Sequence, residues 1–147
     1  MSLRESGDPL DALVRELERF ERTGPRRVLG ALNRTGNDLV RETFDRSRAP
    51  SGQAWAPLKR GPSRKRPGRR PLVKTGNLRS FASHGVIVGD RSVWSMPRYG
   101  EVHQWGTRPE TARQIPARPF LPPGRLPLTW GLRMAHAADL AIAPRFT

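Results

Sequence analysis

The chain has 147 residues, 35% of them hydrophobic, with 15 Pro and 14 Gly, so we expect one domain over 1–147 with part of the chain outside its core. It has no cysteine, which excludes disulfides, a thiol nucleophile and a Cys-ligated metal. The net charge of +14 is unevenly placed: residues 1–45 hold eight Arg against nine acidic residues, and the remainder holds nineteen Lys or Arg against four. A polyanionic partner is therefore expected, either nucleic acid or an acidic protein surface. No apolar run approaches the ~18 residues of a membrane span, so no membrane partner is expected.

The N-terminal part, residues 8–48, is predicted to form a helical hairpin. Asp8 suits an N-cap and Pro9 the first helical position. One apolar stripe at helical spacing follows: Leu10, Leu13, Val14, Leu17 and Phe20. Gly24-Pro25 is interpreted as the end of this helix, and a second helix is expected from about residue 26 to 47.

Residues 50–71 are predicted to form an extended basic arm. The segment contains five prolines and three glycines and too few apolar residues to offset the entropy of ordering. Its cationic residues, expected to face DNA or an acidic protein surface, are Lys59, Arg60, Arg64, Lys65, Arg66, Arg69 and Arg70. The simpler alternative is that these cationic residues form a solvated loop with no binding partner. Trp55 and Leu58 are interpreted as an anchor at the base of the arm.

Residues 72–121 are predicted to be a β-rich part with a short helix. Thr75-Gly76-Asn77 marks a turn or helix cap, after which Leu78 and Phe81 should face the core from either a short helix or the start of a strand. A β-hairpin is expected over 86–95, turning at 89–92, followed by a helix over 99–105 and a strand over 118–121.

A C-terminal helix is predicted over 127–142. The residues available to pack it are Leu128, Leu132, Ala135, Ala138 and Leu140. The expected fold class is therefore α+β: an N-terminal helical hairpin, a small antiparallel sheet, a C-terminal helix and an extended Pro/Arg-rich arm.

No catalytic, cofactor or metal site is predicted. The sequence lacks a phosphate-binding Gly-rich loop and a Gly-x-Ser-x-Gly motif, and its three histidines stand far apart. A catalytic or metal-binding His103 is the remaining enzymatic alternative, whereas the simpler interpretation gives His103 and Gln104 hydrogen bonds at a helix end or subunit contact. Tyr99 and Trp105 could stack on bases, but such aromatics more often fill a core or anchor an interface.

Four segments in one order carry a family resemblance: "RAPSGQAWAPLK" after the N-terminal helices, "LVKTGNLRSF", "YGEVHQWGT" after the hairpin, and "IPARPFL". Over about residues 8–142 the chain resembles the phage virion morphogenesis family, the tail-completion or neck proteins of Mu-like tailed phages.

This resemblance implies a small structural protein of mixed α and β structure, without enzymatic activity, that is assembled in the host cytoplasm and located at the head–tail junction of the virion. It implies a ring, expected to contain six copies, stacked between connector proteins and tail-terminator or tail-tube proteins, with genomic DNA passing without sequence preference. The alternative function is sequence-independent nucleic-acid binding through the basic arm. The residues expected at subunit or ring contacts are Trp55, Leu58, Tyr99, His103, Gln104, Trp105, Ile115, Arg118, Phe120 and Leu121.

Overall fold

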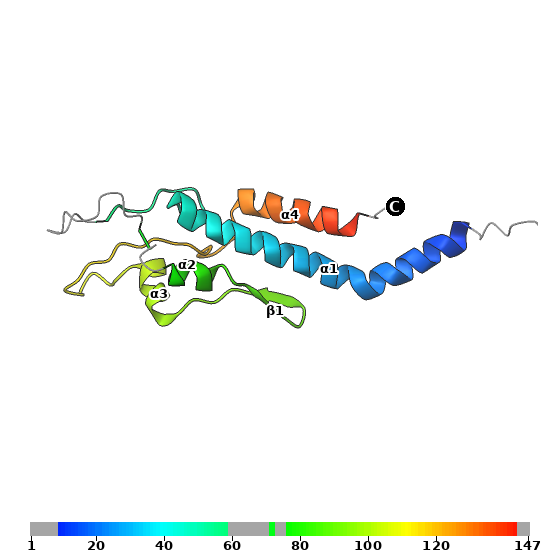
Figure 1. The fold of residues 1–147 in the computed structure, drawn as a ribbon. Helices are drawn as coiled ribbons and strands as arrows, with labels where there is room; N and C mark the ends of the chain where they lie inside the picture. Colours follow the sequence, from blue (N-terminus) through cyan, green and yellow to red (C-terminus); the bar gives the residue numbers. More distant parts are fainter. Residues whose placement is uncertain (1–8, 59–70, 73–75, 144–147) are drawn as a thin grey trace, which may run out of the picture.

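The computed structural model describes residues 9–58, 71–72 and 76–143, which combine one long helix, a two-stranded antiparallel sheet and a C-terminal helix. The predicted α+β class is confirmed. In Figure 1, α4 lies along one side of the C-terminal half of α1, and α2, α3 and the hairpin lie on the opposite side. The elements are α1 Pro9–Arg46, α2 Asn77–Ala82, β1 Val86–Val88, β2 Arg91–Val93, α3 Arg98–Trp105 and α4 Leu128–Ile142.

The N-terminal helical hairpin is a wrong prediction, because α1 is one continuous helix with Pro25 inside it. Proline has a helical φ, but it lacks the N–H that would bond one turn back and its ring crowds the carbonyl there. It can therefore kink a helix without ending it. Figure 1 shows the resulting bend, beyond which the N-terminal half of α1 projects from the body. Phe20 lies over Gly24 at this bend, where an added Cβ would stand 2.5 Å from the ring.

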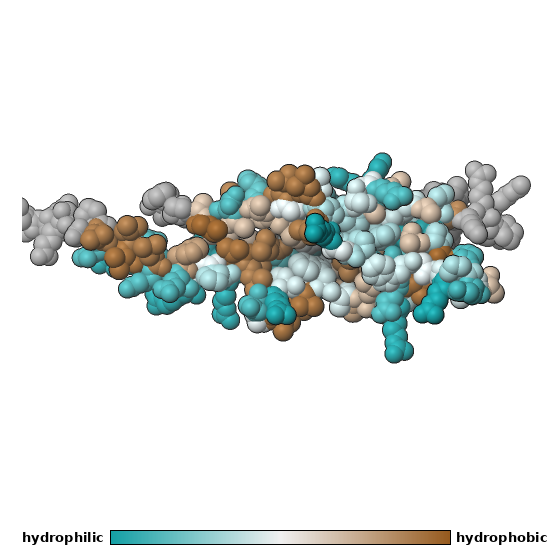
Figure 2. Space-filling view, turned by 180° about the vertical axis from the view of Figure 1, so that it is seen from behind, coloured by the Kyte–Doolittle hydropathy of each residue, from teal (hydrophilic) through white to brown (hydrophobic). Residues whose placement is uncertain are grey.

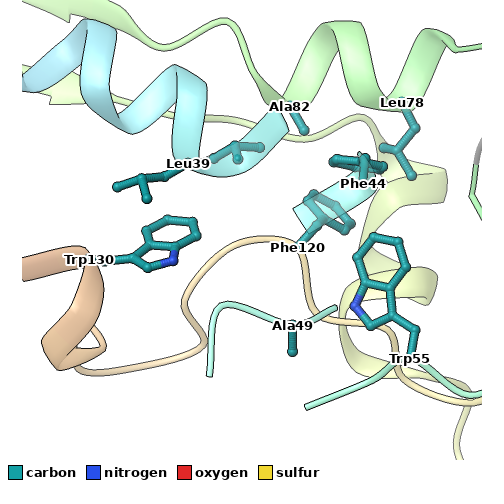
Figure 3. Packing of buried hydrophobic residues seen from close by; sticks show 9 residues of the cluster. Leu39, Phe44, Ala49, Trp55, Leu78, Ala82, Phe120 and Trp130 are labelled. Carbon is teal, nitrogen blue, oxygen red and sulfur yellow. The ribbon is translucent and has the colours of Figure 1, made fainter. Parts of the chain in front are cut away.

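The core lies around the C-terminal half of α1. Phe44 is fully buried between two aromatic rings, edge-on to Trp55 at 5.5 Å and tilted against Phe120 at 5.3 Å. Figure 3 shows these three side chains pointing toward one another, with Leu39 of α1 and Trp130 of α4 at the other end of the cluster. The core thus joins α1 to α4 and to two loop segments.

The predicted hairpin is confirmed, with a tighter turn than expected. β1 and β2 pair antiparallel, with Val86 opposite Val93, around the two-residue turn Gly89-Asp90. Gly89 has φ 62 at the first turn position, as a type II′ turn requires. Asn37 of α1 holds the hairpin, because its Oδ1 accepts from the backbone N of Gly85 and from Nε1 of Trp94, both at 2.8 Å.

Of the two alternatives for residues 77–82, a short helix or a strand start, the structure has the helix, α2, and only one of its two predicted core residues is buried. Leu78 is in the core, whereas Phe81 is half exposed. Arg79 instead fixes α2 to α1 through two hydrogen bonds from its guanidinium to the Asp45 carboxylate, at 3.1 and 3.0 Å.

Helix α4 is confirmed, but of the five residues predicted to pack it only Ala138 lies on the packed face. Trp130 is buried and Met134 packs against the core, while Leu128, Leu132 and Leu140 are exposed. The helix carries two apolar stripes, and the one with small residues lies against α1: Gly131, Ala137, Ala138 and Ala141 are half-buried. The Arg133 guanidinium also donates to both oxygens of Glu42 on α1, at 2.8 Å each.

The predicted strand over 118–121 is wrong, since this segment belongs to no strand. Pro116 and Pro119 have no N–H to donate to a ladder. The predicted arm over 50–71 is described only at its two ends, 50–58 and 71–72. None of the helices in the described part of the chain is long and apolar enough to span a membrane.

Candidate assembly interface

The side chain of Gln104 takes the place of a neighbouring strand for residues 120–121. Helix α3 ends after Trp105 at Gly106, whose φ of 79 and close approach to the backbone of Ala117 require a residue without a Cβ. This brings the returning chain beside α3. Gln104 is buried there, and its Oε1 accepts from the N–H groups of Phe120 and Leu121 at 3.0 and 3.1 Å.

The same returning segment holds the base of the basic arm. The buried guanidinium of Arg118 donates to the carbonyls of Ala56 at 2.8 Å and Pro57 at 3.1 Å. Trp55 Nε1 donates to the carbonyl of Pro119 at 2.8 Å. Residues 55–57 are therefore fixed to the body directly before the cationic run begins at residue 59.

Among the described residues, no carboxylate pairs with His103 in the way that acid–base catalysis uses. Burial first, and then the positive charge of Arg118, lower the pKa of His103 below its usual 6.5. Its Nδ1 is buried and finds no hydrogen-bond partner among the described residues. Burial also lowers the pKa of the Arg118 guanidinium. An uncharged His103 beside a cation offers no carboxylate–imidazole dyad.

No group of three metal-binding side chains occurs among the residues that the structure describes. An apolar hollow of about 280 Å³ lies between α1, the hairpin and α4 and is lined by Gly36, Val40, Trp94, Leu121, Pro122, Leu126, Trp130 and Met134. Its lining has no converging titratable groups, so it has the character of a packing defect or a socket for an apolar side chain.

Four of the ten predicted contact residues lie inside the chain's own core: Trp55, Gln104, Arg118 and Phe120. Side chains buried within one subunit are not available to contact another chain, so for these four the structure corrects the prediction. The sequence predicts an interface anchor at Trp55, because the residues next to it cannot build a core by themselves. Its burial depends on Phe44 and Pro119, which are distant in sequence.

The other six predicted contact residues are at least partly accessible. Leu58, Tyr99 and Trp105 are exposed, and His103, Ile115 and Leu121 are half-buried. Tyr99 and Trp105 belong to α3, which also exposes Val102. A contact role for these six remains a prediction. The seven predicted cationic contacts, Lys59 through Arg70, lie outside the described residues.

A further candidate surface, absent from the predicted contact residues, lies on the N-terminal half of α1. The apolar stripe of the N-terminal half of α1 is exposed throughout, from Leu10 to Phe20. Figure 2 shows apolar side chains gathered on this projecting half, at the left, and another group at the top, over α4. The signal was present in the sequence as a regular stripe, but nothing local shows whether a stripe meets its own chain or another.

Comparison with known proteins identifies the family to which the chain belongs. The sequence profile described as the phage virion morphogenesis family matches residues 6–131 of the chain, well over half of its length. No curated protein and no solved structure matched. The chain therefore belongs to the phage virion morphogenesis family and is a structural protein of the phage virion.

Proposed function

We propose that the protein is a tail-completion or neck component that forms a ring, of six copies, at the head–tail junction and is needed for virion assembly. The single observation that carries this proposal is the amount of apolar surface left uncovered on α1, α3 and α4. Soluble monomers rarely expose large contiguous apolar patches, whereas assembly proteins need them. Membership of a virion morphogenesis family is the context in which such a surface is used.

The charge distribution supports a position on the DNA path. The chain carries 27 Lys or Arg against 13 acidic residues, and a ring multiplies this excess around its channel. Cationic side chains contact the phosphate backbone without reading base sequence. The genome can therefore pass through without a preferred sequence, while connector proteins and tail-terminator or tail-tube proteins bind above and below.

Deletion of the gene from the phage tests this function. We expect lysates that contain DNA-filled heads and complete tails that are not joined, visible by negative-stain electron microscopy. Supplying the wild-type chain in trans should restore joined, infectious particles. Intact infectious particles in the absence of the chain would overturn the proposal.

Sequence-independent nucleic-acid binding is the second candidate, favoured by the excess of cationic residues after Asp45. Duplex DNA binding through Z phosphate contacts weakens with salt with a log–log slope of about −0.9Z. Deletion of residues 60–70 should abolish such binding and leave the fold intact. If the chain that lacks residues 60–70 still binds DNA with the wild-type salt slope, the basic run 60–70 is not the binding element. If it also still restores joined particles, the run is dispensable for assembly.

A further inference from the structure

The projecting half of α1, residues 9–24, is an amphipathic helix whose apolar stripe is exposed in the part of the chain that the structure describes. Leu10, Leu13 and Leu17 are 62%, 55% and 59% exposed. At 1.5 Å per residue this half is about 24 Å long. The body of the chain lies beyond the Pro25 bend, so no other described element reaches along this stripe (Figure 1).

The charges around the stripe indicate what kind of surface it meets. Projection of the helix at 3.6 residues per turn places Asp11, Glu16, Glu18 and Glu21 nearer to the apolar stripe than its arginines. Arg15, Arg19 and Arg22 lie on the opposite side of the helix. The stripe is therefore apolar with an acidic border. A surface that complements this stripe is apolar and surrounded by basic residues. The remainder of this chain is strongly basic, with nineteen Lys or Arg against four acidic residues after residue 45.

The outer face of α4 has the matching properties. Leu128, Leu132 and Leu140 are 77%, 62% and 64% exposed on it. The helix has 15 residues, so at 1.5 Å per residue its length of about 22 Å is close to that of the projecting half of α1. Leu128, Leu132 and Ala135 follow a spacing of four and three residues, and Leu10, Leu13 and Leu17 one of three and four. Such spacings suit side-by-side helix packing at a shallow angle.

The charged residues on and next to α4 place little negative charge where the acidic border of the α1 stripe would lie. Arg125 stands just before the helix, and Arg133 lies on it, already bonded to Glu42. His136 and Asp139 complete its titratable groups. The one acidic residue, Asp139, lies toward the C-terminal end, so the N-terminal two turns are the part that accepts an acidic neighbour.

We propose that the projecting half of α1 in one copy packs on the outer face of α4 in a second copy. The contact joins unlike surfaces, and repetition of such a heterologous contact closes a ring or builds a filament. It deepens the ring proposal above and rests on it only for closure. The copy's own α4 is not the acceptor, because the bend carries the projecting half away from it (Figure 1).

The test uses the purified full chain in sedimentation velocity with two matched pairs of variants. Leu13→Asp places a charge on the stripe, and Ala12→Asp places it on the polar side of the same turn. Leu132→Asp changes the outer face of α4, and Leu132→Met at the same site keeps that face apolar. We expect the two leucine variants, Leu13→Asp and Leu132→Asp, to weaken self-association at least about tenfold. Both controls, Ala12→Asp and Leu132→Met, should assemble like wild type. All three sites are exposed, so circular dichroism should show unchanged helix content.

Mixing the two leucine variants separates the possible geometries. Each retains the surface that the other has lost, so an equimolar mixture should form a one-to-one dimer and nothing larger. Failure of the mixture to dimerise, or wild-type assembly by Leu132→Asp, would overturn the proposal. Either result would favour pairing between the projecting halves of α1 in two copies. A monomeric wild-type chain would also overturn it and leave the stripe to a different virion protein. None of these outcomes bears on whether the gene is needed to join heads to tails.

Discussion

The side-chain amide of Gln104 and the backbone of Leu121 form a two-way hydrogen bond: Oε1 accepts from the Leu121 N–H at 3.1 Å, and Nε2 donates to the Leu121 carbonyl at 2.8 Å. A third bond, from the Phe120 N–H at 3.0 Å, completes the set. One buried side chain thus does for this proline-interrupted segment what a strand does in a sheet. It also positions Arg118 and Pro119, which hold the base of the basic arm.

Gln104→Leu should therefore destabilise the fold far more than loss of an exposed glutamine. The variant leaves two buried N–H groups without an acceptor, at about 1–3 kcal/mol each. Gln114 is the matched control, because its Nε2 also donates to backbone carbonyls, of Pro109 and Thr111, but in an exposed loop. Gln114→Ala should cost less than about 1 kcal/mol. Urea unfolding measures both, and equal losses would contradict the role assigned to Gln104.

Substitution by alanine should change the free energy of unfolding in opposite directions at two glycines of α1. Alanine is favoured over glycine inside a helix by up to about 1 kcal/mol. At Gly30 a Cβ meets only the Arg34 guanidinium at 3.5 Å, so Gly30→Ala should raise the free energy of unfolding. At Gly36 a Cβ would overlap the Trp94 ring, so Gly36→Ala should lower it by about 1–3 kcal/mol. Thermal unfolding of both variants checks the difference in sign.

The Glu42–Arg133 ion pair should make the attachment of α4 sensitive to acid. Its hydrogen bonds to Arg133, opposed in part by burial, lower the pKa of Glu42 below its usual 4.5. A carboxylate with a lowered folded-state pKa stabilises fully above the unfolded pKa, and this contribution is lost as the pH falls through the folded value. Both partners are partly exposed, so Glu42→Gln should cost only about 0.5–1 kcal/mol at pH 7. The difference from wild type should vanish in acid, and a pH-independent difference would contradict this account.

Acid should also act through His103. Its folded-state pKa lies below 6.5, because of burial and then the charge of Arg118, so the unfolded chain takes up this proton first. Stability should therefore fall as the pH drops below about 6.5 and should level off below the folded value. An NMR titration of the imidazole checks the direction directly. A His103 pKa above 6.5 would show that the residue is neither buried nor beside a cation in solution.

Features set by neighbouring residues could be predicted from the sequence. The hairpin follows from two β-rich runs around Gly89-Asp90, and α3 and α4 appear within a residue or two of their expected bounds. The prediction that Gly24-Pro25 ends a helix is wrong, because the same pair can either end a helix or only bend it. The outcome depends on whether the apolar stripe before the pair packs against an apolar stripe after it.

The burial of particular side chains could not be predicted, because it depends on contacts between distant segments. Trp55 is in the core through Pro119, 64 residues away. Helix α4 has two apolar stripes, and only the packing of Trp130 against α1 decides which is internal. In the candidate interface, Leu58, Tyr99 and Trp105 are exposed, as their predicted contact role requires. The exposure of the apolar stripe on α1 could be recognised only from the fold, because no other described element covers it.

Cryo-electron microscopy of purified virions, with mass spectrometry of the same particles, tests the central claim most directly. We predict several copies of the chain per particle and a closed ring of density at the head–tail junction into which the body of α1, α2, α3 and α4 fits. Particles that lack the chain, or that carry it in the capsid wall, would contradict the account.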